Sequence, residues 1–319
     1  MFFFKKKRIR YKNIDTLNSS DLVTMSWEIF GYRDHRLLLL IQTLIKNWTQ
    51  MVKLKTSKIW LLRKETFLAS MNLWVGLTFM RKYDFSQLWF FYQSMFSLSI
   101  WLERLMKLIF LYENLTIQNS APLKLRDIWH NLEKLYSECE KLSIKYGCEK
   151  YFQKNKNENI PIIVLKHLSN FADEWWRYFH IDELNWSSKK SKDPLLEWDN
   201  EINKLIIEKY WTLWESQETK DAINILNSWM RVLAFDNNWK IINNYKDLYN
   251  NQIKYLEIKQ KYSMYYSFCL IKALCELQRQ QSLENPINID LSEFFIVFRR
   301  DYSSAKKYKS WNPNHPYKF

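Results

Sequence analysis

The chain has 319 residues, of which only 3 are glycine and 6 are proline, and it carries a formal net charge of +14. Average glycine usage of roughly 7% would supply about 22 glycines, so glycine-rich phosphate loops, dinucleotide-binding fingerprints and tight-turned β-sandwiches are excluded. Aromatic residues make up 17% of the chain, which argues against disorder. The composition therefore predicts an all-α fold, a helical bundle with a sizeable apolar core.

Positive charge is concentrated at the two ends of the chain. Residues 1–12 hold six basic residues and no acidic one, among them Lys5, Lys6, Lys7, Arg8 and Arg10. Residues 299–319 hold six basic residues against Asp301, among them Arg299, Arg300, Lys306, Lys307 and Lys309. Two basic arms on a nearly neutral body suit a phosphate backbone or an anionic surface. Solvated tails that keep the protein in solution are the alternative.

Aromatic residues interleave with these basic residues: Tyr11, Tyr302, Tyr308, Trp311 and Tyr317. Because aromatic rings stack on unpaired bases, this pattern favours nucleic acid as the partner of the arms.

Residues 22–80 are predicted to form helices broken near Gly31 and around residues 52–58. A long apolar helix is expected from Tyr83 to Asn114, with Glu103 and Lys107 as an ion pair on an exposed stripe. Its residues 85–102 form 18 uncharged positions, the threshold length of a membrane span. Serines and glutamines dilute this stretch and charges follow it, which favours a buried core helix over a span.

The most regular apolar seam runs through Ile128, Leu132, Leu135, Cys139 and Leu142, at the spacing of one helix face. Gly147 is expected to end this helix. Residues 150–160 are predicted to be a polar loop.

Pro161 is expected to open a helix that runs to about Tyr178, and residues 185–194 to form a second loop. Asp193 and Pro194 have the residue types of a helix cap and a first helical position. Beyond residue 217, helices are predicted over residues 220–235, 238–247, 250–281 and 291–298. The predicted organisation is a basic N-terminal arm (1–21), a helical bundle (22–217), a C-terminal helical region (218–298) and a basic tail (299–319).

Two stretches within residues 65–215 carry a family pattern. Glu103 and Lys107 form a Glu-x-x-x-Lys core in the first, and residues 130–135 read His-Asn-Leu-Glu-Lys-Leu in the second. This resembles the central helical pair of HEPN domains, small helical bundles of RNA-processing, toxin and defence proteins, with Asn131 in place of the family's aspartate. Residues 173–179 also look like the aromatic and basic stretch before the family's last helix, expected here over residues 194–213.

Arg126 and His130 are four residues apart, a spacing that places them on one helix face. The resemblance implies that Arg126 contacts the scissile phosphate and that His130 is the general acid or base on the ribose 2′-hydroxyl, in a metal-independent endoribonuclease completed across a dimer. Imidazole suits this role because its pKa lies near neutrality, and guanidinium suits the developing phosphorane charge. The pair encloses three residues where the family has four to six, so an inactive RNA-binding relative is the alternative.

Other side chains complete the predicted site. Arg177 lies beside Trp175 and Trp176, which either stack a base or cap the bundle. The four cysteines form no CxxC pair and no histidine cluster accompanies them, so neither a metal nor a cofactor is expected, and a reducing, cytoplasmic location is predicted.

Three hypotheses follow for the function. The first is an HEPN-like protein that binds RNA, as an endoribonuclease of a toxin–antitoxin or defence system or as its inactive relative, and that forms a homodimer or larger assembly. The second is a non-enzymatic helical subunit of a nucleoprotein assembly that contacts nucleic acid through its basic arms. The third and least favoured is a membrane component that uses residues 85–112 as its apolar element.

Overall fold

A computed structural model describes residues 59–84, 87–116, 131–172, 184, 193–210, 217–235, 241–284 and 291–311. The chain divides into two compact units, Met1–Arg63 and Lys64–Phe319, and the second unit contains almost all the described residues. The described part is mostly helical, which confirms the helical fold class. The predicted N-terminal arm lies outside it.

The elements follow one another in chain order. The first part contains a helix over residues 59–80 and then α3 (Trp89–Thr116), α4 (Leu132–Lys145), α5 (Glu149–Glu158) and α6 (Ile160–Ala172). A helical stretch with a π-helical turn follows as α9 (Pro194–Trp198), η3 (Asp199–Asn203) and α10 (Lys204–Tyr210). The last part contains α11 (Gln217–Trp229), β1 (Arg231–Phe235), β2 (Ile241–Asn244), α12 (Tyr245–Leu248), η4 (Tyr249–Ile253), α13 (Leu256–Glu284), η5 (Leu291–Arg299) and α14 (Tyr302–Ala305).

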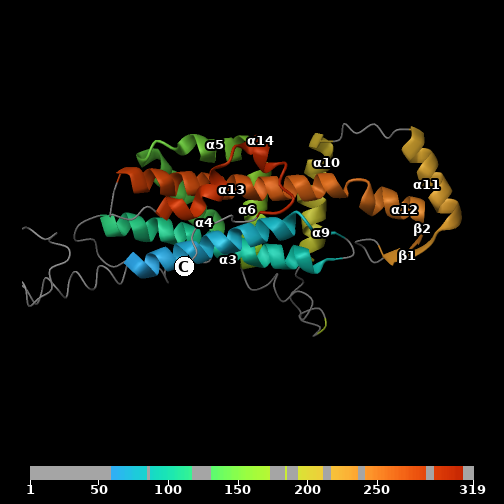
Figure 1. The fold of residues 1–319 in the computed structure, drawn as a ribbon, viewed down its shortest axis with the longest axis horizontal. Coiled ribbons are helices and arrows are strands. Elements are labelled where there is room, and N and C mark those ends of the chain that lie inside the picture. The colour runs from blue at the N-terminus through green and yellow to red at the C-terminus, as the bar shows by residue number, and fades with distance from the viewer. Residues whose placement is uncertain are drawn as a thin grey trace, which may run out of the picture. The chain divides into compact units, whose positions relative to one another are not determined.

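Helix α13 is the centre of the second unit. It packs against α3, α4, α5, α6, α10 and η5, and α3 and α6 pack against each other (Figure 1). Every residue from Ser263 to Gln278 is buried, as expected for a helix covered on all sides. The region predicted as C-terminal thus supplies the axis of the bundle, and the domain boundaries from the sequence stay predictions.

Helix α3 is the long apolar helix that the sequence predicts, although it begins at Trp89 and not at Tyr83. Its Phe91, Met95 and Leu98 are fully buried, which confirms its role in the core. Within the described residues, no helix is both long and apolar enough to cross a membrane. Lys107 and Glu103 form the predicted ion pair at 2.6 Å, but both side chains are largely buried, so the expected exposed stripe is wrong.

Helix α4 begins later than the sequence suggests. Asn131 has an extended backbone and its side chain accepts a hydrogen bond from the Lys134 N–H at 2.9 Å, so it is the N-cap. The Leu132 N–H donates to Ser169 Oγ at 3.1 Å, which attaches this end to α6. Leu132, Leu135 and Cys139 are buried as predicted, and Gly147 follows the helix with a left-handed φ of 59°.

The loop predicted over residues 150–160 is wrong, because these residues form α5. Glu149 lies in its first turn, where its negative charge interacts favourably with the helix dipole. Asn159 is the C-cap residue and has a φ of 59°. Only Phe152 and Asn155 are buried. A helix with so narrow a buried stripe shows no apolar periodicity in its sequence, and this is why the prediction failed.

The helices predicted over residues 220–235 and 238–247 are also wrong in part. Strands β1 and β2 pair antiparallel in a small hairpin, with an irregular register between Arg231 and Ala234. The β-branched residues of both strands and the Asp-Asn-Asn sequence at 236–238 are hairpin signals. By contrast, Asp193 caps α9 with Pro194 at its first position, as predicted.

Candidate nucleic-acid interface

The predicted site residues divide into two groups. One group lies outside the described residues, so the geometry expected for it stays a prediction: the predicted catalytic pair Arg126 and His130, the N-terminal Lys5, Lys6, Lys7, Arg8 and Arg10, and Arg177. Helix α4 itself begins at Leu132 and includes neither Arg126 nor His130. The C-terminal Arg299, Arg300, Lys306, Lys307 and Lys309 are described.

The segment over residues 299–311, expected to be part of a basic tail, packs on the core. Trp311 is 2% exposed, and its ring stacks on Phe268 and Phe298 with centroids 5.0 and 5.9 Å away. Its backbone N–H donates to Thr78 Oγ1 at 2.9 Å, and its indole N–H contacts Met264 Sδ. The expectation that Trp311 stacks on a base is therefore wrong, because protein side chains cover this ring.

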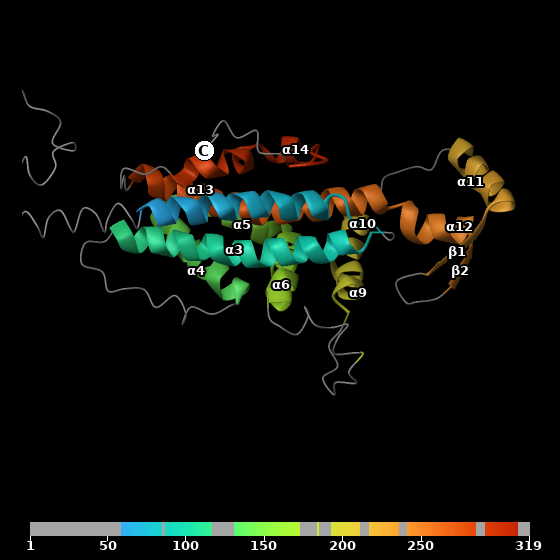
Figure 2. The same cartoon turned by 60° about the horizontal axis from the view of Figure 1, so that its bottom comes forward.

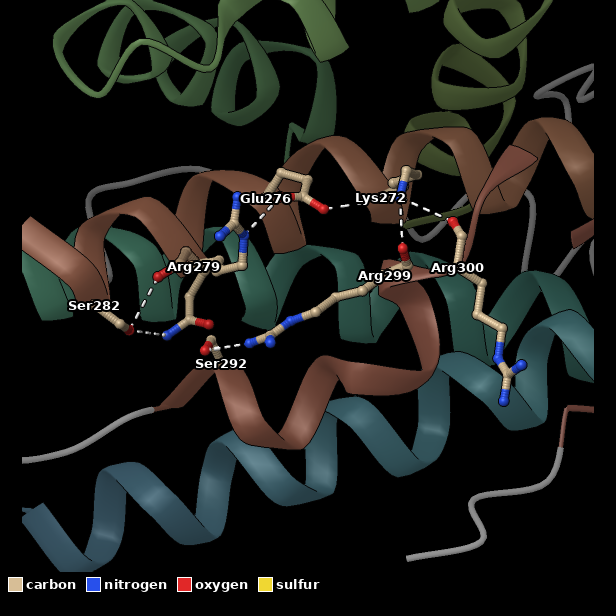
Figure 3. Close-up of polar contacts among 8 residues, drawn as sticks. Lys272, Glu276, Arg279, Ser282, Ser292, Arg299 and Arg300 are labelled. Atoms are coloured by element: carbon tan, nitrogen blue, oxygen red, sulfur yellow. Dashed lines mark hydrogen bonds and ion pairs between the residues drawn. The ribbon is translucent and has the colours of Figure 1, made fainter. Parts of the chain in front are cut away.

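A buried polar network fixes the start of this segment (Figure 3). Lys272 Nζ donates to the backbone carbonyls of Arg299 and Arg300 at 3.1 and 2.9 Å, and it lies 3.7 Å from Glu276. Arg279 pairs with the same carboxylate at 2.9 Å. Buried charges need partners of this kind, so Lys272 and Glu276 have a structural explanation.

The side chains of the two predicted arginines differ in availability. The Arg299 guanidinium donates a hydrogen bond to Ser292 Oγ, so it already has a partner within the fold. Arg300 is exposed, extends away from the Lys272–Glu276 network in Figure 3, and lies 5.4 Å from the centroid of the Tyr308 ring. Arg300 is thus the more accessible of the two for an anion.

The three predicted lysines lie in different environments. Lys306 Nζ is 4.4 Å from the centroid of the Tyr265 ring, a cation–π contact that attaches α14 to α13. Lys307 is exposed. Lys309 lines a cleft with residues far away in the sequence.

This cleft, hereafter the basic cleft, has a volume of about 640 Å³. It lies where the end of the helix over residues 59–80, the start of α3 and the start of α13 meet. Its cations are Arg81, Lys82 and Lys309. Its other lining residues are Gln87, Phe90, Ile253, Leu256, Glu257 and Gln260.

Arg81 is the buried cation of the basic cleft. It directly follows the helix over residues 59–80, and its backbone N–H donates to the Leu77 carbonyl at 3.0 Å, at the helix end where the dipole favours positive charge. Its Nη1 donates to Gln260 Oε1 at 3.1 Å, and its Nη2 lies 3.4 Å from Glu257 Oε1. Gln260 also donates to the Tyr83 carbonyl at 2.7 Å, so the amide that orients the guanidinium is itself held in place.

The charges of the basic cleft are not balanced among its lining residues. The Arg81 side chain is only 7% exposed, whereas the Glu257 side chain is 78% exposed, and an ion pair open to water contributes little. The buried Arg81 Nε has no hydrogen-bond partner among the described residues. The exposed ammonium groups of Lys82 and Lys309, next to the buried positive charge of Arg81, can form charge-assisted hydrogen bonds to phosphate or carboxylate oxygens. The cleft can therefore hold an anion.

Sequence reasoning identified Lys309 and missed Arg81 and Lys82. The Arg-Lys pair occurs at the end of a helix, just before the Tyr83-Asp84 break, and adjacent cations at a helix end are a weak signal. Nothing local connects them with Lys309 or Gln260.

Neither metal-ligand clusters nor accessible thiols are present among the described residues. These residues contain no group of three or more His, Cys, Asp or Glu side chains placed to hold a metal ion. All four cysteines are buried and free, and burial raises the pKa of Cys148 and of Cys269 to about 12, so these thiols stay protonated and unreactive near neutral pH.

Comparison of the chain with protein-family models, with curated proteins and with solved structures finds no match.

Proposed function

We propose that this protein binds RNA and that the basic cleft contacts the phosphate backbone. The observation that carries the proposal is the buried Arg81 guanidinium, which shares the cleft with Lys82 and Lys309 and has one weak carboxylate contact. Phosphate contacts of this kind supply most of the sequence-independent affinity for nucleic acid. Lys309 belongs to the C-terminal group of cations that the sequence predicts to bind nucleic acid.

The salt dependence of RNA binding tests this proposal. The Lys82→Gln and Lys309→Gln variants should each lower the slope of log affinity against log salt by about 0.7 for a single strand. Arg81→Gln should weaken binding further, and its unfolding must be measured because Arg81 is buried. Matched controls are Lys141→Gln on α4 and Arg104→Gln on α3, which remove exposed cations outside the cleft. Equal slopes in cleft and control variants would contradict the proposal.

The HEPN resemblance supports a catalytic form of the same function, in the cytoplasm and in a homodimer or larger assembly. In this form, Arg126 holds the scissile phosphate and His130 transfers the proton of the ribose 2′-hydroxyl, without a metal. Structured RNA incubated with the protein in EDTA is then cleaved, and the His130→Ala variant is inactive. Equal cleavage by both proteins, or cleavage by neither, rejects His130 as a catalytic residue.

The second candidate is a non-enzymatic subunit of a nucleoprotein assembly. It is favoured by exposed apolar side chains on α11 and β1, where Trp229, Leu233 and Ile225 are 84%, 78% and 60% exposed. Exposed apolar surface is typical of interaction sites. This candidate predicts RNA binding without cleavage, and retention of binding in the His130→Ala variant.

A further inference from the structure

An aromatic cluster borders the basic cleft. Phe90 lines the cleft, and its ring centroid lies 3.8 Å from that of Trp89 and 5.4 Å from that of Phe79. Trp89 is 56% exposed although it is the first residue of a helix whose next residues enter the core. The exposed Trp89 indole lies against Phe90, a lining residue of the cleft, so it offers an aromatic face next to the cleft.

Arg81, Lys82 and the Phe90 ring reach the cleft from the two ends of one short connection. Arg81 and Lys82 follow the helix over residues 59–80, and Trp89 and Phe90 begin α3. The connection is held by Asp84, whose carboxylate accepts a hydrogen bond from the Gln87 N–H at 2.8 Å. The Phe90 N–H in turn donates to the Gln87 carbonyl at 3.1 Å. These two hydrogen bonds join Asp84 to the start of α3.

We infer that the basic cleft binds an unpaired RNA segment, with one base stacked against Trp89 and the adjoining phosphates on Arg81, Lys82 and Lys309. This inference rests on the proposed function and names its substrate class. An unpaired base exposes its face to an aromatic side chain, whereas the bases of a duplex are stacked on one another. A site that bound phosphate groups alone would require the cations and would make no contact with the indole.

The charge of the basic cleft distinguishes a nucleic acid from an apolar protein as the partner. Three cations and one carboxylate line the adjoining cleft, and such a surface suits a polyanion. An apolar protein partner would have to desolvate the exposed Lys82 and Lys309 side chains, with Glu257 as the one carboxylate among the lining residues, which is costly.

The test measures binding of the full chain to three probes by fluorescence anisotropy. The probes are a labelled uridine-rich single strand, an abasic strand of the same length with the ribose-phosphate backbone alone, and a blunt RNA duplex. Trp89→Ala should weaken binding of the uridine-rich strand by about fivefold to about a hundredfold, the usual effect of losing one base stack. Trp89→Phe should retain part of the affinity. Trp60→Ala, which removes an indole that is 60% exposed from the first turn of the helix over residues 59–80, is the matched control and should have no effect.

Comparison of the probes isolates the base. Trp89→Ala should leave binding of the abasic strand and of the duplex unchanged, and the wild type should bind the abasic strand more weakly than the uridine-rich strand. An equal loss on all three probes would overturn the inference, because Trp89 would then act through the fold. If Lys82→Gln and Lys309→Gln weaken binding while Trp89→Ala does not, the inference fails and the proposed function stands. If none of these variants weakens binding, both fail.

Discussion

At the scale of single residues, Asn155 shows how a polar side chain fixes a core. It is fully buried on α5, and its amide donates to the Tyr136 hydroxyl at 2.8 Å and to the Cys269 carbonyl at 3.1 Å. One amide therefore connects α5 with α4 and α13. These two hydrogen bonds offset the cost of burying the amide nitrogen.

We predict that Asn155→Ala destabilises the fold by about 2 kcal/mol, because it leaves a cavity and a buried carbonyl and hydroxyl with fewer partners. Asn157→Ala on the same helix is the matched control, since Asn157 is exposed, and it should change stability by less than about 0.5 kcal/mol. Urea unfolding measures both values. Equal effects would show that Asn155 is not part of a cooperative core.

His167 is a buried titratable group that gives a second residue-scale prediction. It is 2% exposed on α6 and lies 3.0 Å from the carboxylate of Glu201 on η3. Burial lowers its pKa below the usual 6.5, and the hydrogen bond to Glu201 opposes this shift. The folded protein thus holds His167 neutral at pH values where the unfolded chain binds a proton.

Because its pKa is lower in the folded protein, His167 contributes to the free energy of unfolding above pH 6.5, and this contribution is lost as the pH falls below that value. Between pH 7.5 and pH 5.5, the free energy of unfolding should fall more in the wild type than in His167→Gln, which cannot titrate. Urea unfolding at the two pH values provides the comparison. A parallel decrease in both proteins would assign the pH dependence to other groups.

At the scale of elements, two glycines serve different purposes. A Cβ at Gly76 would lie 2.8 Å from Leu98 Cγ and 3.3 Å from the Leu98 backbone nitrogen, and Ser94 Oγ donates to the Gly76 carbonyl at 2.9 Å. The helix over residues 59–80 and α3 approach closely here, and Figure 2 shows them side by side. Gly147 has open space around it but a left-handed φ of 59°.

Substitution by alanine should therefore destabilise the fold at both positions, for different reasons. Gly76→Ala should lower the free energy of unfolding by about 1–3 kcal/mol through overpacking. In an uncrowded helix, the same substitution stabilises the helix by about 1 kcal/mol. Gly147→Ala should cost about 1 kcal/mol through backbone strain. Thermal unfolding measures both changes.

Asparagine separates the two causes, because it tolerates the left-handed region. Gly147→Asn should regain much of the stability lost in Gly147→Ala, whereas Gly76→Asn should be worse than Gly76→Ala. Recovery at residue 76 would contradict the proposed close approach.

At the scale of the whole molecule, the question is how much nucleic-acid affinity comes from the N-terminal basic residues and how much from the basic cleft. Residues 1–12 contain six cations with no acid. Deleting them should reduce the salt slope of RNA binding by the contribution of several phosphate contacts, each about 0.7 for a single strand. Titration of the truncated and full chains over a range of salt concentrations gives this difference. An unchanged slope would leave the cleft as the main phosphate contact.

The predictions from sequence succeeded where the signal was local. Asp193 and Pro194 identified the start of α9, Gly147 the end of α4, and uncharged residues the core helix α3. They failed where the deciding interaction was distant. Helix α5 has little apolar periodicity and is stabilised by the contacts of Asn155 with α4 and α13. The sequence places Trp311 in a basic tail, whereas in the structure its ring packs on Phe268.

The sequence by itself determined a mostly helical chain with basic ends, because glycine content, capping residues and charge are properties of the residues themselves. The tertiary structure alone decided which cations meet. Arg81 and Lys309 come from nearly opposite ends of the described chain and share one cleft, because α13 and the segment around Trp311 pack on the helix that carries Arg81. The burial produced by that packing also leaves Arg81 Nε without a hydrogen-bond partner among the described residues.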